Sequence, residues 1–537
     1  MSAGLKVQRK RVAIVGAGAS GMAAAWSLSR FPERFDVTVL EAGSVPGGVA
    51  CTFSMDDSVN PVPVNYGVQG GSPAAHQNTI EMMREFGMGV SECRLDVSFG
   101  KGRWNWKNYC SSPLQTKLRA ETRRFGRLLW WLSKLECFSL FVSIDFVLRF
   151  CRFSSEFRHR MVYPLVALFF GTGNQTPKVS SAIIARVFLD NSLAIFKYDH
   201  DQLLSETPVN IAFDDLQSFY RNMQQSIEGK DCRFSYGTRV TSVERDKGGV
   251  RLQMEASPAT WRGGSDQLSG RYPVRGDGPR CQPEHTEATA AELQTIRREG
   301  QGASAARKSA IDFDEVILAC PANAALAILG DGASFRERRV LGAVEYFDDL
   351  TVTHTDSHYM AEHNDVDDQA IYFIRTHETH PECLEMGFEL TAYQPQLKAH
   401  RAKTGQRIYQ TIFLDRNRAD LWSIDKLNSS KVLDRAWWSA FSHTYAHFRR
   451  VVPWTWTLQG HKHTWYAGSW TLFNTHDIAI SSGLAAAHRL GAPYPFEHNP
   501  LARATFDTVL GQGHLRMRGW DVLFDAIKAR VGFSRDE

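Results

Sequence analysis

The sequence predicts an α/β protein in which a Rossmann-like nucleotide-binding domain is joined to a discontinuous α+β domain. Two observations predict the first domain: a glycine-rich turn at 16–21 separates an apolar run from an alanine-rich run, and a second apolar run ends at Glu41. A third observation is that strand-like and helical runs alternate afterwards without another such turn. With 537 residues, of which 43% are hydrophobic, the chain exceeds one compact core, so two or three domains are expected.

The first unit is predicted to be a strand, a tight turn, a helix and a second strand. Residues 11–15 (RVAIV) are apolar and β-branched, and residues 20–30 are rich in Ala and Leu at helical spacing. Residues 36–40 (DVTVL) then form a second buried strand. Together these segments predict a βαβ unit of about 30 residues.

The turn has the G-x-G-x-x-G pattern of dinucleotide-binding sites. Gly16 permits a tight turn, Gly18 lets the backbone approach a diphosphate, and Gly21 lets the helix pack closely on the strand. Free N–H groups at the helix start attract phosphate, and Glu41 is placed to bind an unphosphorylated ribose. The residues predicted to contact the nucleotide are Gly16, Gly18, Ala19, Ser20, Gly21, Glu41 and Ala42. A glycine turn without a nucleotide is the alternative.

Several later segments also have clear patterns. Residues 74–229 are mostly helical in pattern, and residues 232–254 alternate polar and apolar side chains as a β-hairpin does. Residues 256–310 lack aliphatic periodicity and are rich in Gly, Ser, Pro and Arg, which predicts a disordered insertion. Residues 311–318 (IDFDEVIL) predict a strand that resumes the same sheet domain.

The last third of the chain mixes both kinds of pattern. Residues 345–355 (EYFDDLTVTHT) are strand-like, whereas residues 432–448 (VLDRAWWSAFSHTYAHF) are predicted to be helical. Residues 464–491 predict a strand, a polar loop and a helix of small residues. The predicted organisation is a nucleotide-binding domain at 8–75, 230–334 and 456–495, an α+β substrate domain at 76–229 and 335–455, and a C-terminal helical tail at 496–537.

Composition and charge argue against several classes of protein. The formal net charge is +4 and the pI is near 8.5, below the range of nucleic-acid-binding domains, so no nucleic-acid partner is predicted. The nine cysteines contain no C-x-x-C pair, so we expect neither a disulfide framework nor a metal site. The first ten residues are polar and basic and resemble no signal peptide, so a cytoplasmic location is expected.

The most hydrophobic stretch covers residues 128–153 (LLWWLSKLECFSLFVSIDFVLRFCRF). Lys134, Glu136 and Asp145 interrupt it before about 18 apolar residues accumulate, so a transmembrane helix is not expected. Its aromatic residues stand beside several basic ones, as in helices at a membrane surface. Three interpretations stay open: core packing, the wall of an apolar substrate channel, and peripheral membrane contact.

A second glycine pair follows the first motif. Residues 41–48 (EAGSVPGG) resemble the E-x(5)-G-G continuation of the flavin-containing amine oxidoreductase superfamily, in which this pair passes close to the diphosphate and flavin of FAD. Residues 313–321 (FDEVILACP) resemble the strand and turn that return to the cofactor domain, and residues 466–483 resemble the C-terminal flavin-binding strand and helix. The resemblance spans the whole chain and implies FAD, a cofactor domain of the glutathione reductase type and an amine-oxidase-like architecture.

Within that superfamily, the chain is most similar to predicted FAD/NAD-binding proteins related to the N-terminal oxidase-like domain of plant cyclopropane fatty acid synthases. This likeness depends on the order of Gly468, Trp470, His476 and Gly483 and on residues 163–165 (YPL). The sequence departs from the superfamily pattern at Asn65, where Asp is usual, and at 477–479 (DIA), which replaces Glu-Asp-Gly.

The resemblance implies further cofactor contacts at Gly47, Gly48, Val240, Gly468, Asp477 and Ser482. The backbone of Val240 would meet the adenine, with an ordinary strand valine as the alternative. Asp477 would lie near the ribityl chain or the diphosphate, or else cap the helix that follows it.

No catalytic residue is assigned from the sequence. Because a flavin takes a hydride at N5, the protein mainly has to orient the reacting carbon and exclude water. Trp470 is a candidate wall of the flavin-facing cavity, with core packing as the alternative. His476 is a candidate for proton transfer because the ordinary pKa of histidine is near neutrality, with a structural hydrogen-bonding role as the alternative.

The leading hypothesis is an FAD-dependent oxidoreductase (oxidase, dehydrogenase or desaturase) that takes a hydride from an apolar substrate, such as a lipid or secondary metabolite, or from an amine. Molecular oxygen or another acceptor would reoxidise the flavin. A second hypothesis is a redox-neutral double-bond isomerase of unsaturated fatty acids. The third is a non-catalytic flavin-binding partner protein, which the changes around Asn65 and Asp477 suggest.

Overall fold

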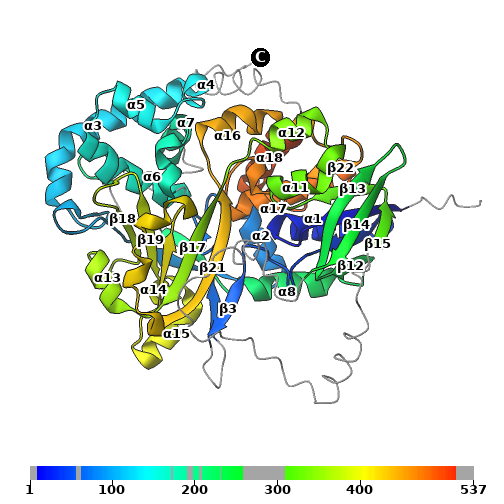
Figure 1. The fold of residues 1–537 in the computed structure, drawn as a ribbon, viewed down its shortest axis with the longest axis horizontal. Helices are drawn as coiled ribbons and strands as arrows, with labels where there is room; N and C mark the ends of the chain where they lie inside the picture. Colours follow the sequence, from blue (N-terminus) through cyan, green and yellow to red (C-terminus); the bar gives the residue numbers. More distant parts are fainter. Residues whose placement is uncertain are drawn as a thin grey trace, which may run out of the picture.

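The structure is a computed structural model that describes residues 9–55, 62–170, 173–189, 197–204, 209–229, 231–257 and 309–515. Most of the predicted insertion at 256–310 and the end of the predicted tail at 496–537 lie outside these residues. The described residues form a parallel-sheet layer, a second sheet layer beside it, and a helical layer around α3 to α7 (Figure 1).

A five-stranded parallel sheet has the order β12, β2, β1, β16, β22. Its strands are β1 (Lys10–Val15), β2 (Phe35–Leu40), β12 (Cys232–Ser235), β16 (Glu315–Leu318) and β22 (Thr464–Tyr466). Helix α1 (Ala19–Ser29) joins β1 to β2, which confirms the predicted βαβ unit. On β1, Val12 and Ile14 pack into one core cluster while Ala13 and Val15 pack into another. Burial on both faces explains why this strand is apolar throughout.

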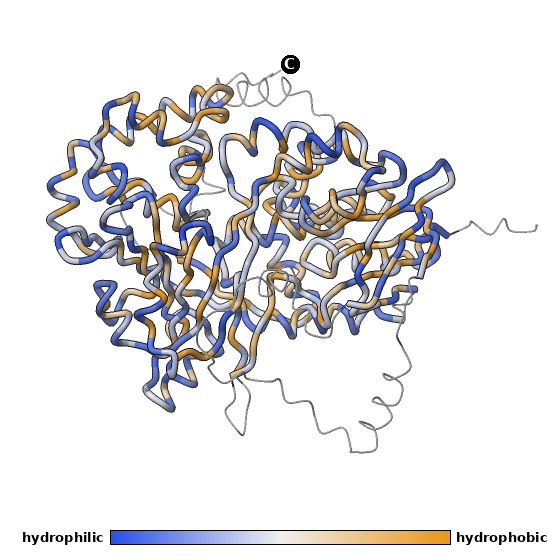
Figure 2. Tube along the Cα trace, viewed as in Figure 1, coloured by the Kyte–Doolittle hydropathy of each residue, from blue (hydrophilic) through white to orange (hydrophobic). Residues whose placement is uncertain are grey.

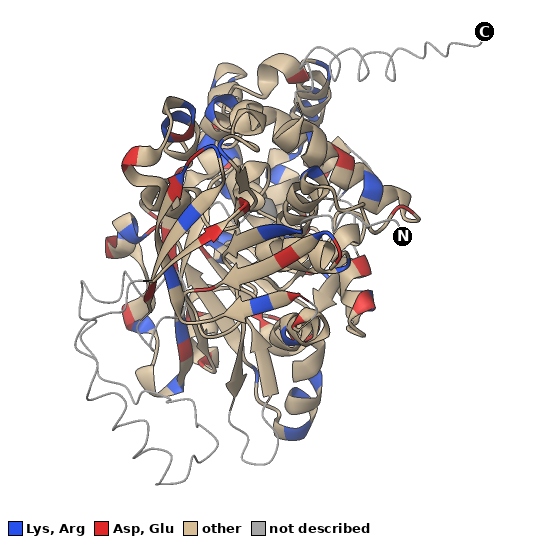
Figure 3. Cartoon of the chain, turned by 90° about the vertical axis from the view of Figure 1, so that its right-hand side faces the viewer, with Lys and Arg blue, Asp and Glu red and all other residues tan. Residues whose placement is uncertain are grey.

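Different elements cover the two faces of the parallel sheet. Helix α17 (His476–Leu490) packs with α1 on one face. The other face is covered by the antiparallel sheet β13 (Thr238–Arg245), β14 (Val250–Ala256) and β15 (Ser309–Phe313), with α11 (Ala322–Leu329) and α12 (Phe335–Leu341). Basic and acidic residues are interspersed over this side of the molecule (Figure 3).

The antiparallel sheet confirms one predicted element and corrects another. Strands β13 and β14 form the hairpin predicted at 232–254, except that residues 232–235 are strand β12 of the parallel sheet. The single strand predicted at 311–318 is two strands, because β15 pairs with β14 whereas β16 enters the parallel sheet. The chain changes sheet at Asp314, whose carboxylate binds Arg11 at the edge of β1.

A seven-stranded sheet forms the second layer, in the order β21, β17, β20, β19, β18, β7, β8. Its strands are β7 (Val97–Phe99), β8 (Trp106–Lys107), β17 (Tyr346–His354), β18 (Tyr372–Thr376), β19 (Leu384–Glu389), β20 (Tyr409–Phe413) and β21 (Val432–Phe441). The prediction of a helix at 432–448 is therefore wrong for the first ten residues, which form β21 and pair with the whole of β17. Only α16 (Tyr445–Arg450) is helical there. Cross-strand pairing outweighs the local helical pattern.

The helical layer contains α3 (Pro113–Lys134), α4 (Glu136–Ser139), α5 (Ile144–Phe150), η2 (Phe157–Val162), α6 (Tyr163–Phe170), η3 (Gly173–Lys178) and α7 (Ser181–Leu189). Helix α3 begins with a capping box, in which Ser112 and Gln115 each bond the other's backbone N–H. Among the described residues, no helix is long and apolar enough to cross a bilayer.

Smaller elements connect the two layers. The short strands are β3 (Thr52–Met55), β4 (Val62–Asn65), β5 (Gly70–Gly71), β6 (Val90–Arg94), β9 (Tyr198–Asp199), β10 (Leu203–Leu204) and β11 (Val209–Phe213). The remaining α-helices are α2 (Gln77–Glu85), α8 (Leu216–Ile227), α13 (Ser357–His363), α14 (Leu390–Tyr393), α15 (Pro395–Thr404) and α18 (Pro500–His514). The hairpin β3–β4 carries the chain from the second glycine pair toward the seven-stranded sheet.

Candidate functional site

The glycine-rich turn between β1 and α1 leaves space for a ligand at one position only. Gly16 has φ +104°, and a Cβ there would lie 2.7 Å from the Ala319 carbonyl oxygen. A Cβ on Gly21 would lie 1.9 Å from the Gly16 oxygen. At Gly18, by contrast, the nearest described atom to a Cβ would be the Gly48 Cα at 4.0 Å. Gly16 and Gly21 therefore serve the packing of the chain, whereas Gly18 borders open space.

The second glycine pair lies directly against this turn. The Gly47 N–H donates to the Ala17 oxygen at 2.8 Å, and Gly47 forms an isolated β-bridge with Gly18. Gly48 has φ +63°, and a Cβ on it would lie 3.1 Å from the Gly18 Cα. Two turns from separate segments thus present bare backbone to one space, which suits a diphosphate.

The N-terminus of α1 begins at this space. Gly18 is the N-cap, and no side chain of the described residues caps the helix. The first N–H groups, including those of Ala19 and Ser20, have no acceptor within the helix. The helix dipole adds a partial positive charge there, so the helix start favours an anion.

Glu41 lies behind the two turns. Its carboxylate accepts hydrogen bonds from the N–H groups of Ala17 (2.7 Å) and Gly43 (2.6 Å). Burial raises the pKa of this carboxyl group, and the hydrogen bonds, including one from Ala42, oppose that shift. A carboxylate has about four acceptor sites, so two hydroxyl donors of a ribose would still find acceptors.

The start of β13 is tied to the residues around Glu41. The Thr238 N–H donates to the backbone carbonyl oxygen of Glu41 at 2.8 Å, and the Gly237 N–H donates to the backbone carbonyl oxygen of Gly43 at 2.9 Å. Val240 follows on the same strand, with its side chain in the core, and the β13–β14 register shifts directly after it. A break in the ladder frees backbone groups from regular pairing, so the predicted base contact at Val240 stays a proposal.

At the C-terminal part of the site, Gly468 and Ser482 contact each other. The Gly468 N–H donates to the Ser482 hydroxyl at 2.8 Å, and Gly468 has φ +152°. One residue on, a Cβ at Gly483 would lie 2.0 Å from the Ser20 oxygen. Helix α17 therefore crosses the start of α1 at a glycine, which brings the C-terminal segment to the first turn.

Two other predicted residues of this segment are engaged within the protein. The Asp477 carboxylate accepts hydrogen bonds from the Thr79 N–H and the Asn78 amide, and so caps α2, while Thr475 caps α17. The Trp470 indole donates to the Cys320 oxygen at 3.3 Å and packs in the core. The predicted roles of Asp477 and Trp470 toward a cofactor or substrate stay predictions.

His476 is buried and bonded at both ring nitrogens. Its Nε2 lies 2.5 Å from the Tyr220 hydroxyl, and its Nδ1 lies 3.2 Å from the Thr79 hydroxyl. Burial lowers the pKa of His476 to about 3. The imidazole is therefore neutral at physiological pH, and the contacts favour the structural role that the sequence left open.

Asn65, where the superfamily has Asp, has a specific structural role. Its amide donates to the carbonyl oxygens of Phe213 (3.0 Å) and Asp214 (2.8 Å), and its Oδ1 accepts from the Thr52 hydroxyl. A carboxylate at this place could make neither donation. The departure from the family pattern is thus explained by two backbone acceptors of this chain.

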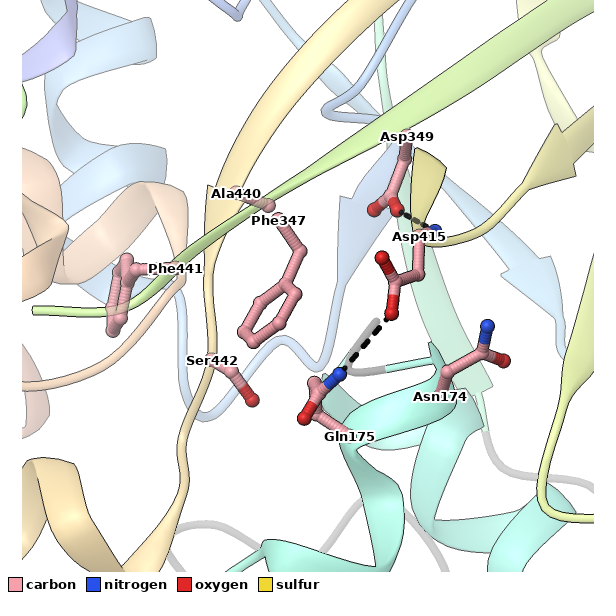
Figure 4. A pocket seen from close by; sticks show the side chains of 8 residues that line it. All are labelled: Asn174, Gln175, Phe347, Asp349, Asp415, Ala440, Phe441 and Ser442. Carbon is pink, nitrogen blue, oxygen red and sulfur yellow. Dashed lines mark hydrogen bonds between the residues drawn. The ribbon is translucent and has the colours of Figure 1, made fainter. Parts of the chain in front are cut away.

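A pocket that the sequence did not predict lies at the edge of β17 and β21 (Figure 4). It is lined by Asn174, Gln175, Phe347, Asp349, Asp415, Ala440, Phe441 and Ser442. It opens to solvent, and only about 10 Å³ of it admits the centre of a water-sized sphere, which is room for about one water or one ammonium group. The lining contains two carboxylates and no basic residue. The sequence offered one signal only, an acidic pair within the strand-like run at 345–355.

The polar groups of this pocket are mostly acceptors. Asp349 accepts from the Asp415 N–H at 2.7 Å, and Asp415 accepts from the Gln175 amide at 3.4 Å. The Gln175 Oε1 and the Ser442 hydroxyl are buried without a hydrogen-bond partner in the described part of the chain. Burial raises the pKa of Asp349 to about 7. Such a pocket fits a donor-rich group such as an ammonium.

The pocket belongs to the sheet face that borders the second glycine pair. Asp349 pairs with Trp438 across β17 and β21, so both side chains lie on the same face. The Trp438 ring would lie 3.6 Å from a Cβ on Gly67, which in turn would lie 2.9 Å from the Val49 oxygen. Val49 directly follows Gly48, so the two glycine turns and this sheet face are neighbours.

Comparison with known proteins agrees with this architecture. Residues 14–86 match the family described as an NAD(P)-binding Rossmann-like domain. No curated protein matches the chain.

Similar solved structures cover nearly the whole chain. One is a fatty acid isomerase from P. acnes that produces CLA, with 14% identity, coverage of 89% of this chain and 98% of that chain, and a TM-score of 0.54. A putrescine oxidase bound to putrescine has 14% identity, coverage of 90% and 100%, and a TM-score of 0.54. The cyclohexylamine oxidase of Brevibacterium oxydans IH-35A has 13% identity, coverage of 90% and 99%, and a TM-score of 0.56.

These likenesses confirm the predicted fold class, and both glycine turns lie within the residues that match the NAD(P)-binding Rossmann-like domain. The narrower likeness to the oxidase-like domain of plant synthases stays a prediction. The chain thus has an amine-oxidase-like fold, with a Rossmann-like domain at its N-terminus.

Proposed function

We propose that this chain is an FAD-dependent oxidoreductase. The observation that carries the proposal is the convergence of two glycine turns and the uncapped start of α1 on one space, with the Glu41 carboxylate behind them. Bound FAD supplies a hydride acceptor at N5. The residues proposed to hold it are Gly16, Gly18, Ala19, Ser20, Gly21, Glu41, Ala42, Gly47, Gly48, Val240, Gly468, Asp477 and Ser482.

The proposed substrate is a small amine or apolar molecule bound between the second glycine pair and the seven-stranded sheet. Asp349 and Asp415 favour an amine, because two buried carboxylates without a basic partner in the pocket lining gain most from a cationic donor. With an amine bound, the ammonium would lower the pKa that burial raises, so the ionised Asp349 would orient the ammonium. Molecular oxygen or another acceptor would complete the turnover, and a cytoplasmic location is part of the same proposal.

The test is anaerobic mixing of the flavin-loaded protein with a panel of amines and unsaturated fatty acids. We expect an amine to bleach the visible flavin absorption. Asp349→Asn is expected to raise KM for that amine at least about tenfold, the usual effect of losing one charged hydrogen bond, while FAD content stays constant. The exposed pair Arg251–Asp312 lies outside the pocket, so Asp312→Asn is the matched control and should leave KM unchanged.

The fatty acid isomerase among the similar structures favours a second candidate, the redox-neutral isomerase. Product mass separates the two reactions, since isomerisation leaves the substrate mass unchanged whereas oxidation removes two hydrogens. If bound flavin is bleached by no substrate and no reductant, the non-catalytic partner becomes the better explanation. The structural role of Asn65 removes one of the two reasons for that third candidate.

A further inference from the structure

Exposed apolar side chains gather on α3, α4 and α5. Of the sixteen large apolar side chains that are exposed among the described residues, seven lie between positions 130 and 150. They are Trp130, Trp131, Leu135, Phe138, Phe141, Phe146 and Phe150. Phe138 is 72% exposed and Phe150 is 78% exposed. Scattered apolar residues are normal on a surface, but a concentrated set marks an interaction surface.

These residues are not needed to hold the helices on the protein. Helix α3 already buries Phe125, Leu129 and Leu132, and α5 buries Ile144 and Leu148. The exposed aromatics form a second apolar face on helices whose first face is fully packed. A helix that is apolar on both faces needs a second partner.

The charge of this face is positive. Arg127, Lys134 and Arg152 are exposed, and none has an acidic partner within the described part of the chain. The acidic residues of the same segment are already engaged: Glu136 binds Arg186, and Asp145 binds Arg149, Arg158 and Tyr163. The unpaired charges are therefore all basic.

The arrangement fits a membrane surface better than a groove-binding partner. Helices α3 to α5 form an outer edge of the molecule, away from the parallel sheet, and apolar positions recur along them (Figures 1 and 2). The Lys134 ammonium lies 5.6 Å from the Trp130 ring centroid, so a positive charge lies directly beside the exposed aromatic surface. Aromatic rings flanked by basic residues are typical of helices that lie in an anionic membrane interface.

We propose that α3, α4 and α5 dock this protein peripherally on an anionic lipid surface. The exposed Phe and Trp rings enter the boundary between headgroups and acyl chains, and Arg127, Lys134 and Arg152 contact lipid phosphates. This inference is independent of the proposed redox function.

The test is co-sedimentation of the full-length protein with phosphatidylcholine vesicles that contain or lack phosphatidylglycerol. We expect binding to the anionic vesicles, weakening as salt is raised. Phe146→Ser with Phe150→Ser should reduce binding at least about tenfold, because two large apolar side chains no longer leave water. Lys134→Gln with Arg152→Gln should reduce binding to the anionic vesicles only.

The matched control is Phe335→Ser, which removes an aromatic ring that is 76% exposed on α12, in the other half of the molecule. It should bind vesicles as the unchanged protein does, and all variants should keep their unfolding midpoint and FAD content. A protein that stays in the supernatant with anionic vesicles, or a Phe335 variant that loses as much binding as the double Phe variant, overturns the proposal. The face would then be assigned to a protein partner.

Discussion

The ionisation of Asp349 should make the stability of the folded chain depend on pH. Burial raises its pKa from 3.8 to about 7 in the folded chain. A carboxyl whose pKa is raised by folding stabilises the protein while it is protonated, so its contribution is complete below pH 3.8 and is lost as the pH rises through about 7.

Asp349→Asn removes this ionisation while keeping an oxygen that can accept from the Asp415 N–H. We expect the variant to equal the unchanged protein near pH 4 and to exceed it above pH 7, by about 4 kcal/mol in free energy of unfolding. Urea unfolding of both proteins across this pH range measures the difference. If the difference in free energy of unfolding between the two proteins were the same at every pH, folding would not raise the pKa of Asp349.

Asn65 should not tolerate the carboxylate that is usual in the superfamily. Asn65→Asp loses both donations to the Phe213 and Asp214 carbonyls and places a buried charge against them. We expect a loss of about 2–4 kcal/mol in free energy of unfolding. Asn222→Asp, at an exposed position on α8, is the control, with an expected change within about 0.5 kcal/mol. Equal stability of the two variants would refute the structural role of Asn65.

At the residue scale, local roles were predictable from the sequence and long-range roles were not. Gly21 and the position of Glu41 follow from a motif within one βαβ unit, because each acts on neighbours in that unit. The motif also predicted Gly16, but not its close neighbour Ala319, which lies far along the chain. Asp349 and Gln175 meet across more than a hundred residues. No spacing rule connects such positions, so this pocket emerged only from the fold.

At the element scale, the contact of α1 with α17 holds the site together. Gly483→Ala would place a Cβ 2.0 Å from the Ser20 oxygen, so the helices must separate. We expect a loss of about 1–3 kcal/mol in stability and weaker FAD binding, measured by thermal unfolding and flavin fluorescence. Gly513→Ala, on α18 with no atom within 4 Å of the new Cβ, is the control and should be neutral or slightly stabilising. If the Gly483 variant bound FAD as tightly as the unchanged protein, the crossing of α1 and α17 would not be needed for FAD binding.

Elements were predictable where their pattern is strong and self-contained. Strands β1 and β2 and helix α1 were predicted to within a residue or two, because a buried parallel strand is apolar throughout. Strand β21 was mistaken for a helix, since its residues pack on two sides of a sheet whose other strands are far along the chain. The break between β15 and β16 was missed for a similar reason, because each strand belongs to a different sheet.

At the scale of the whole molecule, function is expected where the two sheet layers meet. The two glycine turns come from the first 48 residues, and helix α17 crosses the start of α1 beside them near residue 483. The seven-stranded sheet borders the second turn through Trp438 and Gly67. We therefore expect cofactor and substrate to meet at this junction, while α3 to α5 face a lipid surface at the outer edge.

The central claim is that the space beside Gly18 holds the diphosphate of FAD, and Gly18→Val tests it most directly. The backbone at Gly18 is extended (φ −72°), and a Cβ there meets no described atom closer than 4.0 Å, so the apo variant should unfold at the same temperature as the unchanged apo protein. The measurement is the visible absorption spectrum and FAD affinity of both purified proteins. We expect the unchanged protein to take up FAD stoichiometrically and the variant to bind it at least about a hundredfold more weakly, as expected when a diphosphate loses its backbone contacts. Equal FAD binding by the variant, or no FAD uptake by the unchanged protein, would contradict this claim.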